Sequence, residues 1–212
     1  MNIINDALTE LNRIFQILNV EKFDGVLPEP IITIQFVKNT FGHFITKKIW
    51  KNKNSDINSE DDSFYEININ PNGFLRSPEE IVATLLHEMV HYYNQIQNIN
   101  DCNGNVHNKK FKLIAENVGL KVEKNKKCGW GVTYCSDSLK DYIKNTIQPN
   151  QSVFKYFRYI PPKEQKKRKK TIFKYTCPYC GLEIKGKEKL NVKCGLCNVN
   201  LEMENPEGES DG

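Results

Sequence analysis

The stretch SPEEIVATLLHEMVHYYNQI, residues 77–96, decides the fold of this chain because it carries the signals of an amphipathic helix with a clear start. Ser77 followed by Pro78 and Glu80 is typical of a capping box, in which the serine and the glutamate satisfy free backbone N–H groups reciprocally. We therefore predict that a helix begins here. Its apolar residues recur at helical spacing and should face the core: Val82, Leu86, Met89, Tyr93 and Ile96.

Another face of this helix carries the string HEMVH, in which His87, Glu88 and His91 form an HExxH pattern. Two imidazoles four residues apart share one face of a helix and can bind one metal ion together. The glutamate between them then points at the metal and can act as a general base toward water. The pattern indicates a catalytic zinc site, and the alternative is a hydrogen-bonded histidine pair at a packing boundary.

A catalytic zinc usually takes three protein ligands and keeps a fourth position open. The metzincin pattern is excluded because Asn94 and Gln97 stand where its glycine and third histidine would be. His107 and Glu116 are the two remaining candidates, and Glu116 would complete a site of the thermolysin type. We favour His107 because it follows an expected turn, precedes an expected helix over residues 111–118 whose first turn it could occupy, and offers an imidazole, which suits zinc.

The segments before residue 77 predict a helix and three strands. Residues 2–19 have apolar side chains at helical spacing and should form an amphipathic helix on the core. Alternating apolar residues predict strands at residues 32–36, 44–50 and 65–70. The last of these should have one solvent-facing side, and it could serve as the edge against which an extended substrate pairs.

Four of the seven cysteines form two CxxC pairs separated by thirteen residues: Cys177 and Cys180, and Cys194 and Cys197. This spacing is typical of a zinc ribbon, in which two knuckles hold one tetrahedral ion, and a redox dithiol is the alternative. Gly181 and Gly195 suit tight knuckle turns, and residues 182–184 and 190–192 should form two short strands. So short a segment buries too little surface to fold alone, so its folding should require the metal.

The net charge of +4 conceals a basic segment between residues 155 and 174, where nine Lys or Arg residues accompany one acidic residue, Glu164. Such a cluster favours a polyanionic partner, and a solvated linker is the alternative. Tyr156, Phe157 and Tyr159 lie among these cations, which fits stacking on single-stranded nucleic acid, although the rings could equally pack on the preceding domain. Seven basic residues are candidates for DNA binding: Lys155, Arg158, Lys166, Lys167, Arg168, Lys169 and Lys170.

Other properties of the sequence bear on location. No apolar run approaches the twenty residues that a membrane span needs, so we expect no membrane partner. Residues 1–8 contain no basic residue, unlike a secretory signal. An odd number of cysteines, four of them in CxxC pairs, favours thiolate metal ligands in a reducing compartment. We expect a cytoplasmic protein.

These features together resemble the SprT-like family of zinc metalloproteases, to which bacterial SprT and the protease domain of eukaryotic Spartan belong. The resemblance covers about residues 5–150. Family members usually have a glycine after the third histidine, where this chain has Asn108, and we expect the local turn to differ there. The resemblance rests on these features: Leu11-Asn12 with Phe15, Leu27-Pro28, Gly42-His43-Phe44, the helix from Glu80 to Asn94, and His107 with Phe111.

The resemblance implies an α+β fold, with a zincin-like metalloprotease domain and a small C-terminal zinc-ribbon β-hairpin. The protease domain would contain an N-terminal helix, a small and mostly antiparallel sheet and the HExxH helix. We expect four parts: residues 1–150 as the SprT-like domain, 151–172 as a basic linker, 173–201 as the zinc ribbon and 202–212 as an acidic tail.

The resemblance also favours His107 over Glu116 as the third ligand. Together with the cysteine pairs it gives an expectation of two zinc ions, one catalytic and one structural. The expected function is a zinc-dependent endopeptidase in which Glu88 is the general base, acting on protein substrates at or attached to DNA. The alternative is a non-cleaving adaptor for nucleic acid or protein, and the intact Glu88 counts against it.

Overall fold

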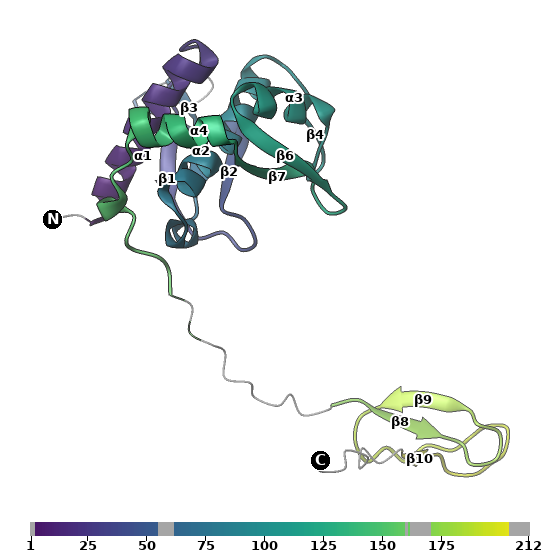
Figure 1. The fold of residues 1–212 in the computed structure, drawn as a ribbon. Coiled ribbons are helices and arrows are strands. Elements are labelled where there is room, and N and C mark those ends of the chain that lie inside the picture. Colours follow the sequence, from purple (N-terminus) through teal and green to yellow (C-terminus); the bar gives the residue numbers. More distant parts are fainter. Residues whose placement is uncertain (1–2, 55–61, 160, 162–170, 204–212) are drawn as a thin grey trace. The chain divides into compact units, whose positions relative to one another are not determined.

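The computed structural model describes residues 3–54, 62–159, 161 and 171–203. The chain divides into two compact units, Met1–Ile160 and Pro161–Gly212, and each is described by itself. Figure 1 shows that the first unit combines helices and small sheets, whereas the second is built from short strands. The mixed α+β architecture predicted from the sequence is confirmed.

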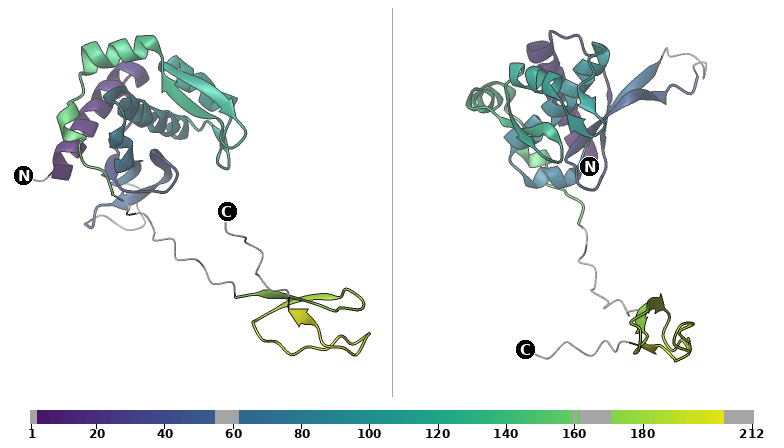
Figure 2. Two further views of the ribbon diagram at one scale, coloured as in Figure 1. Left: turned by 60° about the horizontal axis from the view of Figure 1, so that its bottom comes forward. Right: turned by 90° about the vertical axis from the view of Figure 1, so that its right-hand side faces the viewer.

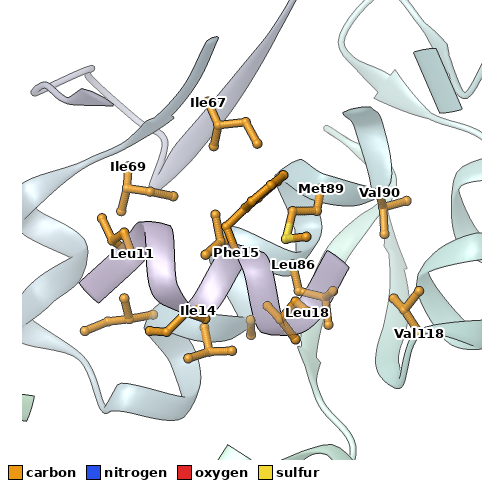
Figure 3. Packing of buried hydrophobic residues seen from close by; sticks show 14 of the residues in the cluster. Leu11, Ile14, Phe15, Leu18, Ile67, Ile69, Leu86, Met89, Val90 and Val118 are labelled. Carbon is orange, nitrogen blue, oxygen red and sulfur yellow. The ribbon is translucent and has the colours of Figure 1, made fainter. Parts of the chain in front are cut away.

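The centre of the first unit is the helix α2 (Pro78–Ile96), which begins where the sequence predicts. The Ser77 hydroxyl accepts a hydrogen bond from the Glu80 N–H at 3.3 Å, and the Glu80 carboxylate accepts one from the Ser77 N–H at 3.1 Å. The apolar stripe of α2 packs on the long N-terminal helix α1 (Ile3–Phe23). Figure 3 shows how residues of α1, α2 and the first sheet share one core: Leu11, Phe15, Leu18, Ile67, Ile69, Leu86 and Met89.

The first sheet contains three strands in the order β1-β3-β2. The strand β3 (Ser63–Ile69) lies in the centre, parallel to β1 (Ile31–Ile34) and antiparallel to β2 (Gly42–Lys51). The sheet is therefore mixed, where the sequence suggested a mostly antiparallel one. The outer parts of β2 and β3 extend away from the rest of the unit, as the right-hand view of Figure 2 shows.

The expectation of a solvent-facing edge strand at residues 65–70 is wrong. β3 is paired on both sides, and the side chains of Glu66, Asn68 and Asn70 are at most 6% exposed. They are buried because each finds internal partners: Glu66 accepts the indole N–H of Trp50 at 2.6 Å, and Asn68 exchanges two hydrogen bonds with the backbone of Gln35. An alternating pattern alone cannot distinguish such satisfied polar groups from solvated ones. The outer strands of this sheet are β1 and β2.

The second sheet also packs against α2, through β7, and has the order β4-β5-β7-β6. Its longer strands form an antiparallel hairpin, and one helix packs against them. The elements of this half are β4 (Cys102–Asn103), β5 (Val106–His107), α3 (Lys109–Asn117), β6 (Leu120–Asn125), β7 (Gly129–Cys135), α4 (Asp137–Tyr142), the π-helical turn η2 (Ile143–Ile147) and, after an irregular stretch, the 3-10 turn η3 (Gln151–Val153).

The first unit continues beyond residue 150, where the sequence suggested that a linker begins. Phe154 is buried and packs on Phe74 of the 3-10 turn η1 (Pro71–Leu75), with ring centroids 5.0 Å apart. Arg158 also contacts this unit, because its backbone N–H donates to the Asn72 side chain at 3.1 Å and its guanidinium lies over the Phe36 ring. The beginning of the basic segment is thus part of the first unit.

The second unit is a three-stranded sheet in the order β10-β8-β9. The hairpin consists of β8 (Phe173–Thr176) and β9 (Glu183–Gly186), and β10 (Glu202–Met203) pairs with β8. The expected strand at residues 190–192 does not form, because β8 pairs with β9 instead. None of the helices in the described residues has the length and apolar character that crossing a membrane requires.

Truncation of a core residue tests this packing. Leu18 is fully buried between α1 and α2, so we expect Leu18→Ala to lower the free energy of unfolding of the first unit by about 2–5 kcal/mol. Leu113→Ala is the matched control, since Leu113 is 60% exposed and its truncation should cost less than about 0.5 kcal/mol. Urea denaturation followed by circular dichroism measures both, and equal effects would contradict the assigned core.

Candidate metal centre and cleft

Three histidines from two elements meet at one point beside α2. His87 and His91 lie one turn apart on the helix, as predicted, and His107 reaches them from β5. The Nε2 atom of His107 lies 3.2 Å from Nε2 of His87 and 3.0 Å from Nε2 of His91. The structure therefore brings together the three residues that the sequence proposes as ligands of one metal ion.

The other ring nitrogens of His91 and His107 show which tautomer they adopt. Nδ1 of His91 lies 2.7 Å from Oδ2 of Asp101, and Nδ1 of His107 lies 3.1 Å from the carbonyl oxygen of Cys128. Burial opposes ionisation of Asp101, but the hydrogen bonds from His91 and Asn94 outweigh it and lower its pKa, so Asp101 is a carboxylate that only accepts. Both Nδ1 atoms therefore carry a proton, so Nε2 is the nitrogen of each ring that can bind a metal.

The rings of His87 and His107 are neutral. Burial, reinforced by the neighbouring imidazoles, lowers the pKa of His87 well below its ordinary value, and burial likewise lowers the pKa of His107. His87 is held in place by a hydrogen bond between its Nδ1 and the Thr133 hydroxyl at 2.9 Å. Nitrogen lone pairs that face one another at 3.0–3.2 Å, the separations found here, repel unless a cation lies between them. The donor set thus fits a divalent ion such as zinc, which prefers imidazole nitrogen.

Glycines of β7 allow the His107 ring to enter this position. A Cβ atom on Gly131 would lie 2.4 Å from Nδ1 of His107, and one on Gly129 would lie 2.3 Å from the His107 carbonyl oxygen. Gly129 also has a positive φ of 63°. This role was not predicted, although the two glycines that flank Trp130 are a signal in the sequence. Asp101 and Thr133 were missed too, and no local pattern marked them.

His107 differs in setting from the sequence expectation. It lies in β5 and not in the first turn of a helix, because Asn108 caps α3 by accepting hydrogen bonds from the N–H groups of Lys110 and Phe111. Asparagine is a preferred cap, so the departure from the glycine of the family preserves a defined turn. Glu116, the rival ligand, lies on an exposed part of α3 and pairs with Lys112 at 3.6 Å.

The carboxylate of Glu88 faces the strand β2, next to the three histidines. It is 5% exposed, and burial raises its pKa to about 7. The backbone N–H of Phe44 hydrogen-bonds to it and offsets part of this effect. Gly42 permits the close approach, since a Cβ there would lie 3.0 Å from Oε1 of Glu88. A carboxyl group with a pKa near neutrality is suited to exchange protons at physiological pH.

These residues line a cleft of about 1430 Å³. One wall is formed by the start of β2, including Gly42, His43 and Phe44, and the other by residues 131–135 of β7. The floor is the polar face of α2, which contacts both strands. His43 is therefore a cleft-lining residue, and it lies 3.5 Å from the Asn68 amide.

The second candidate metal site is formed by the four cysteines of the ribbon. Cys177, Cys180, Cys194 and Cys197 place their sulfur atoms within 4.8 Å of one another. The backbone N–H of Cys180 lowers the pKa of the Cys177 thiol to about 7, which favours the thiolate that binds metal. This cluster could hold a metal ion, as the sequence predicts.

Two equivalent turns shape the ribbon. The N–H of Gly181 bonds to the Cys177 carbonyl, and the N–H of Asn198 bonds to the Cys194 carbonyl. Both Gly181 and Asn198 have positive φ. Gly195 has no positive φ. The predicted glycine turn is therefore found in the first knuckle, whereas Asn198 adopts the left-handed conformation in the second.

The predicted DNA-binding residues are only partly described. Lys155 lies over the Tyr156 ring at 5.5 Å, and Arg158 lies over the Phe36 ring at 4.8 Å. The other five lie outside the described residues: Lys166, Lys167, Arg168, Lys169 and Lys170.

The Asp101–His91 hydrogen bond yields a prediction about metal affinity. Asp101→Asn removes the charge that fixes the His91 tautomer, and we expect zinc affinity at the histidine site to fall by about tenfold to a hundredfold. Competition with a chromophoric chelator measures this affinity. Asp137→Asn is the control, because Asp137 is exposed and pairs only with surface lysines. Equal affinities of the two variants would contradict the orienting role of Asp101.

The ribbon yields a second metal prediction. Cys194→Ser should lower the metal content of the purified chain by about one equivalent, because a tetrahedral four-cysteine site loses a ligand. Cys128→Ser is the matched control, since Cys128 lies outside the cluster. Elemental analysis of both variants checks this, and an unchanged metal content in Cys194→Ser would contradict a metal-bound ribbon.

Comparisons with known proteins agree with this geometry. The sequence model of the SprT-like family matches residues 11–129, more than half of the 212-residue chain. No curated protein and no solved structure matches the chain. The matched range includes the capped helix α2 and all three histidines of the cluster. The chain therefore belongs to the SprT-like family.

Proposed function

We propose that the first unit is a zincin-type, zinc-dependent endopeptidase in which Glu88 is the general base. One observation carries this proposal: three imidazole Nε2 atoms converge beside a buried carboxyl group on the floor of an open cleft. Family membership supports it, since SprT-like proteins are expected to be metalloproteases. The seven free cysteines fit a reducing compartment, and we propose the cytoplasm as the site of action.

In this proposal His87, His91 and His107 hold one zinc ion through Nε2, and the ribbon cysteines hold a second, structural ion. Zinc at the histidines would supply Lewis acidity, which acidifies water and polarises a peptide carbonyl. Glu88 accepts a proton from water as the water oxygen bonds to the carbonyl carbon. It then gives this proton to the leaving amine as the C–N bond breaks, so its own state is restored. A pKa of about 7 suits both transfers.

The substrate would bind as an extended segment along β2. Among the described residues, β2 pairs with β3 alone, so it is an edge strand of this sheet. Gly42, His43 and Phe44 of this strand line the cleft next to Glu88. Strand addition at this edge would place a peptide bond over the histidine cluster. The sequence pattern suggested β3 as the strand that pairs with substrate, and β2 is the strand next to it.

We further propose that the basic segment and the ribbon bring the protease to DNA, so that its substrates are proteins at or attached to nucleic acid. The support is the charge of this segment, in which nine cations accompany one acidic residue. Arg158 is already engaged with Phe36, so we assign most of the contact to the cations from Lys166 to Lys170.

The test of the catalytic role is Glu88→Gln, which keeps the size of the side chain and removes the base. We expect the rate of cleavage of an unfolded protein substrate to fall at least about a hundredfold, while two equivalents of zinc are retained. Glu116→Gln is the matched control and should leave both activity and zinc content unchanged, because Glu116 lies away from the histidines.

Persistent cleavage by Glu88→Gln would end the general-base assignment. Loss of zinc in Glu116→Gln would instead show that the third ligand is the glutamate. If the zinc-loaded wild-type chain cleaves no protein with or without DNA, but still binds DNA, the chain is a non-cleaving adaptor.

A further inference from the structure

Arg76 lines the cleft at the end of η1, just before α2. Its Nη2 donates to the Thr84 hydroxyl at 2.6 Å, and its Nε donates to the Gly73 carbonyl at 3.3 Å. The Phe41 ring lies against the guanidinium, 3.8 Å from its central carbon. Gly73 makes room for this arrangement, because a Cβ atom there would lie 3.2 Å from Nη2. The guanidinium is thus held in one position.

The partners of Arg76 are all neutral. Within the described part of the chain, no carboxylate oxygen lies within 4.0 Å of its guanidinium. The negative charge of Glu80 acts on Arg76 electrostatically and favours its charged form. The Glu80 carboxylate itself, however, accepts the Ser77 N–H in the capping box. Arginine keeps its charge in proteins, so this is a partly buried cation without an anion. Such a charge is costly unless a ligand compensates it.

The guanidinium also has N–H groups that make no hydrogen bond to the described residues. Arginine carries five N–H groups in a planar fork, and two hydrogen bonds account for only two of them. No partner of Nη1 is found among the described residues. A fork with free, parallel N–H groups and an aromatic ring at its back is suited to a carboxylate, which it can bind with two hydrogen bonds.

Thr84 connects this arginine to the proposed catalytic base. It lies one helical turn before Glu88 on α2, and both side chains lie 3.0 Å from the position of a Cβ atom on Gly42. One turn of helix rises about 5.4 Å, whereas an extended peptide rises about 3.3 Å per residue. A carboxylate bound by Arg76 would therefore lie within about two residues of the bond under attack.

We infer that Arg76 forms a carboxylate-binding subsite of the cleft, which selects substrates with an acidic group close to the scissile bond. That group is either a Glu or Asp side chain or, in a substrate that is cleaved close to its end, the free C-terminal carboxylate. The inference rests on the proposed endopeptidase function. It adds a preference that the metal centre alone does not provide, since the histidines and Glu88 contact only the reacting bond.

The first experiment compares matched peptides on the zinc-loaded wild-type chain. One set places Glu or Gln at each of two positions on either side of the cleaved bond, and the other ends in a free carboxylate or an amide. We expect kcat/KM to favour the acidic member about tenfold to a hundredfold at one position, mainly through KM, because a charge-assisted bidentate contact is lost in the neutral member. The set that shows the effect identifies the source of the carboxylate.

The second experiment removes the guanidinium. Arg76→Gln should bring the ratio of acidic to neutral kcat/KM close to one, and Arg76→Lys should retain only part of it, since lysine cannot form the planar fork. Lys140→Gln is the matched control: it removes another cation that lines the cleft and should leave the ratio as in wild type. Thermal melting and zinc content verify that each variant is folded, and the wild-type and Arg76→Lys comparison stands if Arg76→Gln does not fold.

The subsite is rejected if wild type shows no acidic preference at any position, or if the preference persists in Arg76→Gln. A binding measurement separates this outcome from failure of the proposed function. Zinc-loaded Glu88→Gln should bind the acidic member of the pair more tightly by fluorescence anisotropy. Acid-selective binding without any wild-type cleavage would uphold the subsite and reject the endopeptidase, whereas cleavage without acid preference would do the reverse.

Discussion

The convergence of three imidazole Nε2 atoms is the constraint on which the first unit depends. Nε2 of His107 lies about as close to the nitrogens of His87 and His91 as a hydrogen bond would allow, yet His91 and His107 carry their protons on Nδ1. Nitrogen lone pairs that face one another in this arrangement repel, so a cation at the centre would stabilise the cluster. A metal ion bound here would link metal binding to the stability of the fold, as one bound by the four-cysteine cluster would.

The helix α2 meets this constraint because it is packed on two sides by different parts of the chain. Its apolar stripe is fixed by α1 and β3, and its polar face is left to line the cleft between β2 and β7. Glycines provide the close approaches on both walls, Gly42 next to Glu88 and Gly131 next to His107. The rigid scaffold thus holds the proposed base and ligands while the cleft stays open to an extended chain.

The part of this architecture that could be predicted is the part encoded locally. The capping box at Ser77 and the spacing of His87 and His91 depend on residues within one or two helical turns, so the sequence alone indicates both the helix start and the shared face. The roles of Asp101 and Thr133 could not be predicted, because only the folded structure shows the histidine that each of them contacts.

The same limit explains why the strand β3 was predicted correctly but its solvent-facing side was not. Asn68 has the polar character of a solvated residue, and its burial depends on backbone partners thirty-three residues away in the chain. His107 shows the intermediate case: its residue type indicated a ligand and the family pattern favoured it over Glu116, but only the packing of β5 against β7 brings the ring to the metal position.

Anomalous diffraction at the zinc absorption edge, from crystals of the zinc-loaded chain, tests the central claim most directly. The account predicts one peak about 2.0–2.1 Å from Nε2 of His87, His91 and His107, and a second about 2.3 Å from the four ribbon sulfurs. A peak at the cysteines with none at the histidines, or a histidine-site ion bound by Glu116 in place of His107, would contradict it.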